Sequence, residues 1–371
     1  MQNFLNHPKV STYEESGVNI SEGDKASRIA YNAAKATFKG REGMIGEPVT
    51  QDGGFAGLID MGEFYLVQND DGIGTKEIIA DEIGKYDTLG YDLLAMVIDD
   101  AACVGAEVIT CSNTMDVKKV IAEKIEKMME GFKTACLEHK VVIPGGEIAE
   151  LNTMVNCNLW NATSVGIVGK DKVITGEKIK EGDQVIALRS DGFRSNGFSL
   201  VRYILEKQFG ETAYMHSYEE GKLLSTVDES WGAKVLTPAR IYYSLIMALH
   251  GRYGKSSQVD IHGIVHVTGG GIAANLNRIL KEGQGAHLDN LFPPHEMMLR
   301  LQEIGVVSDS EAYRVWNMGN GMLVIADPSD ANLIIERAKT FGIEARVAGQ
   351  INDTGKITLK SQGFSDNGKM L

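Results

Sequence analysis

The chain has 371 residues, of which 43% are hydrophobic and 23% are charged, a balance that is typical of a folded globular protein. This length exceeds what one hydrophobic core usually serves, so we expect two domains. The formal net charge of −13 argues against nucleic acid or a membrane surface as a partner, because both are anionic.

The cysteines and the first residues exclude further classes of protein. Cysteines 103, 111, 136 and 157 are widely spaced and form no Cys-x-x-Cys pair, so we expect no zinc site. The N-terminal residues lack the basic start and apolar run of a secretory signal, and no segment approaches the ~18 apolar residues that a membrane span needs. These features predict a cytoplasmic protein with reduced thiols.

The first expected helix covers residues 21–38, with Ser21 as its N-cap. A glycine-rich loop over residues 51–57 follows it and precedes an expected strand at 58–61. The backbone N–H groups of the glycine pair 53–54 are suited to cradle phosphate groups. However, the loop has no Walker-type lysine, so it equally fits a simple bend before the strand.

An aspartate-glycine turn at residues 71–76, with the sequence DGIGTK, follows a short aromatic and aliphatic strand at 63–69. Its two glycines allow the backbone to turn tightly beside a ligand. Mg²⁺ is commonly held by one or two carboxylates together with phosphates, so Asp71 is a candidate metal ligand and Lys76 a candidate phosphate contact. The alternative is an ordinary loop, because Asp-Gly is a common turn dipeptide.

Hydrophobic residues recur with the 3.6-residue helical period over residues 88–104. Asp92, Asp99 and Asp100 share one broad face of this expected helix. A solvated face usually explains such acids, but this helix is otherwise apolar and has no lysine or arginine between residues 91 and 103. Buried carboxylates need a compensating partner, and a cation is a suitable one.

Strands and helices alternate after this helix, which predicts a mixed α/β first domain. The expected elements are a strand at 108–111, a helix at 122–139 and strands at 141–143 and 162–168. Glu147 stands just beyond a strand and a glycine pair, so it is either an acid near a ligand or an exposed residue of a turn.

Two strand-loop-helix segments in the second half are candidate anion sites. A polar loop containing Arg194 leads from a strand that ends near residue 188 into an expected helix at 198–207, where free N–H groups and a guanidinium favour an anion. The alternative is an N-capping loop with a surface arginine. The segment 262–271 has the same form, and its His266 is either a buried, satisfied histidine or an active-site group.

Taken in order, these motifs resemble the family of phosphoribosylformylglycinamidine cyclo-ligases, also called aminoimidazole ribonucleotide synthetases. The resemblance covers most of the chain, and many collinear matches are more specific than any single one. The matching segments are 12–18, 71–76, 87–96, 105–107, 145–147, 195–202, 236–242, 266–271 and 317–322.

The resemblance implies a homodimer of two-domain α/β subunits with mixed sheets. An N-terminal domain, residues 1–171, would bind ATP and Mg²⁺ and form a barrel-like core with the partner's sheet. A C-terminal α/β domain, residues 172–371, would close the active-site cleft. The implied activity is the ATP-dependent ring closure of formylglycinamidine ribonucleotide to aminoimidazole ribonucleotide, with ADP and phosphate as the other products, in purine biosynthesis.

The resemblance also assigns roles to single residues. It implies Asp71 and Asp100 as metal carboxylates, and Asp71, Lys76 and His266 as catalytic residues. Around ATP and its metal it implies Gly53, Gly54, Asp71, Thr75, Lys76, Asp92 and Glu147. On the substrate side it implies Arg194, Ser195 and Asn196. Phosphoryl transfer depends mainly on positioning and on neutralising charge, which a metal ion and a lysine provide.

Three positions depart from the family pattern. Arg194 stands where the family commonly has histidine, Asp99 where it commonly has asparagine, and a polar segment at 108–114 replaces an apolar strand that ends in Asp-Tyr. Two alternative functions therefore stay open at the sequence level. One is a related ATP-dependent kinase or synthetase acting on another metabolite, and the other is a non-catalytic nucleotide-binding paralogue.

Overall fold

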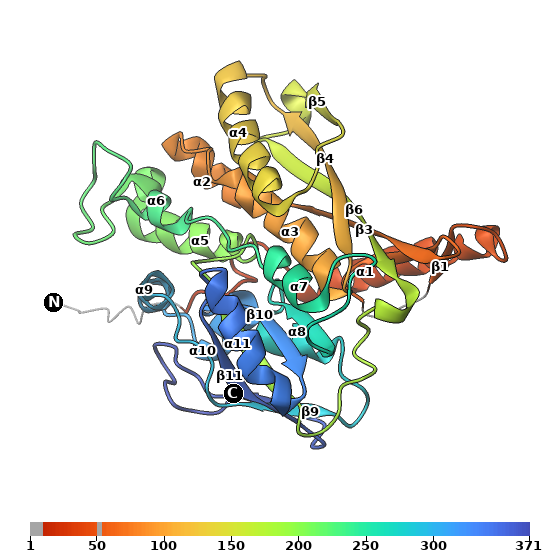
Figure 1. Cartoon of the computed structure of the whole chain (residues 1–371). Coiled ribbons are helices and arrows are strands. Elements are labelled where there is room, and N and C mark those ends of the chain that lie inside the picture. The colour runs from red at the N-terminus through yellow and green to blue at the C-terminus, as the bar shows by residue number, and fades with distance from the viewer. Residues whose placement is uncertain (1–9, 50–53) are drawn as a thin grey trace.

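The computed structural model describes residues 10–49 and 54–371. Two six-stranded mixed sheets with flanking helices form the molecule, the first built from residues 47–169 and the second from residues 184–359 (Figure 1). The expected mixed α/β class with two sheets is thereby confirmed. Along the described ranges, no helix is long and apolar enough to cross a membrane.

The first sheet has the strand order β1-β2-β3-β6-β4-β5. Neighbouring strands are antiparallel except β4 and β5, which are parallel. The strands are β1 (Glu47–Val49), β2 (Gly57–Asp60), β3 (Phe64–Gly72), β4 (Glu107–Val117), β5 (Gly146–Glu150) and β6 (Leu159–Gly169).

The second sheet has the strand order β12-β9-β11-β7-β10-β8, in which only β12 and β9 are parallel. Its central strands β7 and β10 are largely apolar and buried, which is typical of a sheet covered on both faces. The strands are β7 (Gln184–Arg189), β8 (Ile261–His266), β9 (Gly285–Leu288), β10 (Asn320–Ala326), β11 (Ala345–Asn352) and β12 (Ile357–Leu359).

Helix α3 (Leu89–Cys103) is the central helix of the molecule. It contacts β3, β6 and α4 of the first half and also β8 and α7 of the second half, so its side chains are buried almost all round (Figure 1). The other helices are α1 (Ile20–Lys35), α2 (Lys76–Ile83), α4 (Ala122–His139), α5 (Phe198–Phe209), α6 (Trp231–Val235), α7 (Tyr243–His250), α8 (Gly271–Asn277), α9 (Glu296–Gly305), α10 (Asp309–Val315) and α11 (Ala331–Thr340).

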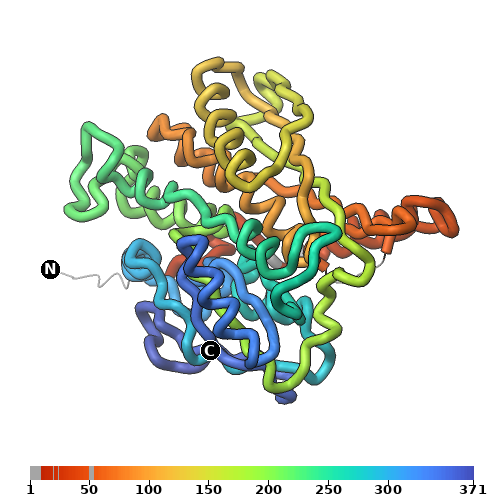
Figure 2. The backbone as a smooth tube through the Cα atoms, in the orientation of Figure 1, coloured from red at the N-terminus to blue at the C-terminus, as the bar shows by residue number. Residues whose placement is uncertain are grey.

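The chain passes from the first sheet to the second along residues 170–183, on one side of the molecule (Figure 2). One core of buried hydrophobic side chains extends through both halves. Polar groups on α3 therefore face groups of the second half without intervening solvent.

The expected helices at 88–104 and 122–139 are confirmed to within a residue or two. The first helix begins at Ile20, and its N-cap is Asn19, whose side chain accepts the N–H of Glu22, so the prediction of Ser21 as N-cap was wrong.

Two local predictions in the first sheet were also wrong. Asp71 and Gly72 are not a turn but the last residues of β3, because they pair with Ala162 and Asn161 of β6. Residues 146–150, for which a turn was one of two interpretations, form β5, since the eleven-residue β4 offers them an edge for parallel pairing. The expected strand at 141–143 is reduced to a single bridge from Val142 to β4.

Candidate active site

Asp71 lies at the end of β3, opposite Ala162 of β6. Its Oδ1 accepts the N–H of Gly72 at 2.7 Å. Burial raises the pKa of Asp71 to about 6, and the neighbouring Asp100 carboxylate adds to this shift. A Cβ at Gly72 would stand 2.2 Å from Oδ1 of Asn161, so a larger residue there would displace that side chain.

Asp100 approaches the same place from α3. Its Oδ1 is 2.7 Å from Nδ1 of His266, and its Oδ2 is 3.5 Å from the amide nitrogen of Asn69. Burial raises the pKa of Asp100 to about 7, although the nearby guanidinium groups of Arg278 and Arg194 oppose the shift. Two carboxylates that repel each other in a water-poor place are a donor set that suits a hard divalent cation.

Arg194 is almost completely buried, with 2% of its surface exposed, so it is not the surface arginine of the alternative interpretation. Its Nη2 donates to Oδ2 of Asp99 at 2.9 Å, and the carbonyl oxygen of Arg240 accepts from Nη1. The same Nη2 lies against Nε2 of His266. The loop that was predicted to bind an anion therefore directs its cation into the protein, toward α3.

His266, at the end of β8, is fully buried between Arg194 and Asp100. Burial, together with the adjacent Arg194 cation, holds the pKa of His266 well below its usual value, so the ring is neutral. A guanidinium has only donors, so Nε2 must accept and Nδ1 must carry the hydrogen that is donated to Asp100. The histidine is thus buried and satisfied, as one interpretation expected, and its role in an active site stays a prediction.

Lys76 and Asp92 are joined in an ion pair with 2.7 Å between Nζ and Oδ1, and neither side chain is exposed. Nζ also donates to the carbonyl oxygen of Thr237 at 3.1 Å, and Oδ1 accepts the N–H of Ala239 at 2.8 Å. The Lys76 ammonium is thus occupied by protein groups, and its predicted contact with phosphate stays a prediction.

Ser195, Asn196 and Thr75 place polar groups near the loop between β7 and α5. The Ser195 Oγ and Asn196 Oδ1 atoms are buried and find no hydrogen-bond partner among the described residues. Thr75 Oγ1 lies 3.4 Å from Ser199 Oγ. An ideal Cβ at Gly269 would lie 3.5 Å from the amide nitrogen of Asn196, so this loop lies beside the glycine run that opens α8. Unpartnered buried polar atoms indicate a place for a ligand.

In the predicted phosphate loop, Gly54 contacts Arg278, which follows α8. The carbonyl oxygen of Gly54 accepts from Arg278 at 2.8 Å, and this guanidinium lies 4.0 Å above the Phe55 ring, while Gly53 lies outside the described residues.

Glu147 is exposed on β5, and the strand order places it three strands from β3, roughly 14 Å away. Within one subunit, the structure does not bring Glu147 to Asp71.

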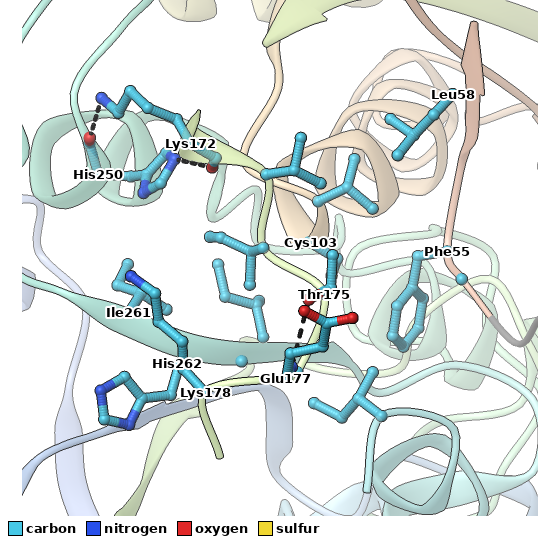
Figure 3. A pocket seen from close by; sticks show the side chains of 18 of the residues that line it. Phe55, Leu58, Cys103, Lys172, Thr175, Glu177, Lys178, His250, Ile261 and His262 are labelled. Carbon is cyan, nitrogen blue, oxygen red and sulfur yellow. Dashed lines mark hydrogen bonds between the residues drawn. The ribbon is translucent and has the colours of Figure 1, made fainter. Parts of the chain in front are cut away.

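Cavities lined by described residues adjoin Asp71 and Gly54. One of about 390 Å³ adjoins Asp71 and is lined by polar groups of β3, β4 and β6, among them Ser112, Asn113 and Asn161. The other, of about 820 Å³, lies between the halves and is lined by Phe55 and Leu58, by the linker, and by histidines 250 and 262 of the second half (Figure 3). The predicted site residues Asp71, Asp100 and His266 do not line the larger cavity.

Sequence reasoning missed Asn69 and Arg278, both of which interact with Asp100. Asn69 stands two residues before Asp71 and points to the same face of β3, so strand periodicity offered a signal for it. Arg278 follows α8 and had no local signal.

Comparison with known proteins identifies relatives along almost the whole chain. Residues 53–168 match the family model described as AIR synthase related protein, N-terminal domain, and residues 180–362 match the corresponding C-terminal domain. A phosphoribosylformylglycinamidine cyclo-ligase of Pyrococcus furiosus is 35% identical over 95% of this chain and 98% of its own. The protein of the same name from Methanococcoides burtonii is 36% identical over 93% of this chain and 96% of its own.

Solved structures share the fold at low sequence identity. A structure of the HypE-HypF complex has a TM-score of 0.59 and 18% identity, covering 86% of this chain and 92% of that one. Thiamine-monophosphate kinase from Stenotrophomonas maltophilia has a TM-score of 0.56 and 17% identity, covering 90% of this chain and 96% of that one. These likenesses show that the fold is shared.

Proposed function

We propose that this chain, which belongs to the AIR synthase related family, is a phosphoribosylformylglycinamidine cyclo-ligase. It catalyses the ATP-dependent ring closure of formylglycinamidine ribonucleotide to aminoimidazole ribonucleotide in purine biosynthesis. The observation that carries this function is the identity of about one third to curated cyclo-ligases over nearly the full length of both chains.

The reaction consumes one ATP to activate the formyl amide oxygen as a phosphate ester. A nitrogen of the amidine then attacks the activated carbon, the ring closes, and phosphate and ADP leave. The protein's part is to hold two ends of one molecule together and to neutralise the charge on the transferred group. A closed site also keeps water from the activated intermediate.

The carboxylates of Asp71 and Asp100 would hold Mg²⁺, whose role when bound is to neutralise phosphate charge. Burial raises the pKa of both carboxyl groups, and a bound cation would offset this by favouring their charged forms, which supports the assignment. The 390 Å³ polar cavity beside Asp71 supports a place for part of the ATP next to this metal. The proposed phosphate contacts of Gly53, Gly54 and Thr75 rest on the family resemblance, since Gly54 lines the larger cavity. Glu147 would reach the nucleotide only from a neighbouring subunit.

Ser195 and Asn196 would bind the ribonucleotide substrate, since their unpartnered oxygens are available for it. Lys76 and Asp92 would act on the nucleotide side by holding the start of α2 next to α3, because their charged atoms are paired with each other. Asp71 is therefore the catalytic residue that the geometry supports best.

A homodimer would form through the first sheet. The apolar side chains of Val142 and Leu159 are 59% and 46% exposed, and they lie on one face of this sheet because their partners on β4, Thr110 and Asp116, are six residues apart. A second copy would cover them, as the twofold pairing of like surfaces requires. The two domains would divide near residue 171, between the two family matches. Both substrates are charged nucleotides, so we place the activity in the cytoplasm.

The deciding experiment is to incubate the purified protein with formylglycinamidine ribonucleotide, ATP and Mg²⁺ and to quantify aminoimidazole ribonucleotide and ADP. We expect the two products in equal amounts and none without ATP, with the relative from Pyrococcus furiosus as a positive control. A parallel incubation with thiamine monophosphate tests the alternative of a kinase. A folded protein that forms no aminoimidazole ribonucleotide would overturn the proposal.

A further inference from the structure

Both Nη atoms of Arg194 donate to protein groups. Its Nη2 reaches Oδ2 of Asp99 and lies 3.4 Å from the carbonyl oxygen of Ala95, both on α3, and its Nη1 reaches the carbonyl oxygen of Arg240. The remaining Nε is buried without a partner in the described part of the chain. With 2% of its surface exposed, the side chain is almost entirely enclosed by protein.

Both carboxylate oxygens of Asp99 also have hydrogen-bond partners in the protein. Its Oδ1 accepts the N–H groups of Tyr242 and Tyr243, each at 2.9 Å, where α7 begins, and its Oδ2 accepts from Arg194. Both of its oxygens are used by the second half of the chain, and its side chain is not exposed. Asp99 is therefore not a further metal ligand, and its charge is matched to Arg194.

His266 connects this buried ion pair to Asp100. Its Nε2 faces the Arg194 guanidinium, which can only donate, so the ring hydrogen is on Nδ1 and points to Oδ1 of Asp100 at 2.7 Å. A histidine whose second nitrogen is fixed in this way has one tautomer and one ring orientation. Asp99, Arg194, His266 and Asp100 thus form one hydrogen-bonded chain that crosses from one half of the molecule to the other and back.

We propose that Arg194 is a positioning residue, which fixes the tautomer of His266 and thereby the orientation of the Asp100 carboxylate, and that Asp99 holds Arg194 in place for this purpose. The proposal rests on the proposed function for the role of Asp100 as a cation ligand. In this proposal Arg194 does not bind the substrate directly, as the family resemblance implied, but acts through His266. Arg194 and Asp99 then serve one purpose together.

The first test substitutes Arg194→Lys, which keeps a positive charge for Asp99 but lacks the planar fork that reaches Asp99 and His266 together. Mn²⁺, bound in the absence of substrates and followed by electron paramagnetic resonance, is the metal probe. Loss of an outer partner of a metal ligand typically weakens metal affinity about 10- to 100-fold. We expect a weakening in this range, with the KM for the ribonucleotide unchanged within about twofold at saturating Mg²⁺.

A second readout is independent of both metal and activity. In protein labelled with ¹⁵N-histidine, the His266 ring shows a protonated Nδ1 and an unprotonated Nε2, and Arg194→Lys mixes the two tautomers. Arg252→Lys is the matched control, because Arg252 also bridges the two halves, by a 2.7 Å ion pair to Glu107, but does not contact His266. The control variant is expected to leave the tautomer and the Mn²⁺ affinity unchanged.

The double variant Arg194→Gln with Asp99→Asn removes both buried charges at once, so it keeps the test decisive if Arg194→Lys fails to fold. It is expected to fold and to bind Mn²⁺ as weakly as Arg194→Lys. Unchanged Mn²⁺ affinity and tautomer, or a KM for the ribonucleotide raised tenfold or more at saturating metal, would overturn the positioning role. If the wild type forms no product, the proposed function fails, while the tautomer measurement still decides the role of Arg194.

Discussion

Lys76 and Asp92 form an ion pair from which water is excluded, with 2.7 Å between Nζ and Oδ1 and no exposed surface on either side chain. The pair joins the start of α2 to α3. It also binds the segment before α7, through the backbone of Thr237 and Ala239. Charges taken out of water in this way are stable only while each keeps its partner.

Substituting Lys76→Met is therefore expected to lower the free energy of unfolding by about 3 to 5 kcal/mol, because it leaves the Asp92 carboxylate buried and uncompensated. Chemical denaturation measures this directly. The double variant Lys76→Met with Asp92→Leu removes both charges and should recover most of the loss. If Lys76→Met alone is as stable as the wild type while activity is lost, the lysine serves phosphate and the ion pair is dispensable.

Asp71→Asn is expected to lower turnover at least 100-fold with little change in the thermal unfolding midpoint. Burial already raises the pKa of Asp71 to about 6, so removing its charge relieves a desolvated carboxylate and does not weaken the fold. The product assay, together with calorimetry of unfolding, separates the two effects. Asp353→Asn, at an exposed residue that lines neither cavity, is the control for the loss of one charge. Full activity in Asp71→Asn would remove this residue from the metal site.

The pH dependence of stability should depend in part on His250. Burial, with a contribution from Lys172, lowers the pKa of His250 to about 4, and its Nε2 lies 2.8 Å from the carbonyl oxygen of Lys172. Between pH 4 and about 6.5 the unfolded chain binds this proton and the folded protein does not, so the free energy of unfolding falls as the pH is lowered.

His250→Gln keeps a donor for the Lys172 carbonyl but does not titrate. The loss of unfolding free energy from pH 7 to pH 5 should accordingly be smaller by about 2 kcal/mol in this variant than in the wild type. Urea titrations at several pH values provide the comparison, and His287→Gln, at an exposed histidine, serves as the control. Identical pH slopes in the wild type and His250→Gln would contradict the expectation.

The elements that the sequence predicted best are those with strong local signals. Helices α3 and α4 have apolar residues at the helical period over their whole length, so their bounds were found closely. Asp71 and Gly72 were misplaced because an Asp-Gly pair signals a turn locally, whereas pairing with β6, some 90 residues later along the chain, decides the matter.

The same contrast between local signals and long-range contacts applies to the candidate site. Asp71, Asp100 and His266 were recognised as residue types in suitable motifs, and Asp100 and His266 do meet at 2.7 Å. The partners of the buried charges could not be read from the sequence. Asp99 and Arg194 are 95 positions apart, and only the packing of α3 against the second half brings them together. An acidic face that the sequence linked to a cation is thus partly neutralised by the protein's own arginine.

The close packing of α3 on α4 gives a final prediction about stability. A Cβ at Gly90 of α3 would lie 2.1 Å from the backbone nitrogen of Phe132, and one at Gly131 of α4 would lie 2.2 Å from the carbonyl oxygen of Asp87. The two helices therefore approach each other through paired glycines, and a side chain at either position must push them apart. Gly90→Ala is expected to lower the free energy of unfolding by about 1 to 3 kcal/mol, the usual range for overpacking, although alanine is the better helix former.

Gly23→Ala is the matched control for this effect, because Gly23 also lies within a helix but a Cβ added there would meet no atom within 4 Å. There the helix propensity acts alone and should favour alanine by up to about 1 kcal/mol. Denaturant unfolding of both variants shows whether the two substitutions change the free energy of unfolding in opposite directions. Because Gly90 stands two residues before Asp92, displacement of α3 should also reduce activity in Gly90→Ala and leave it intact in Gly23→Ala. Equal stability of the two variants would show that α3 and α4 can separate without loss, contrary to the packing described.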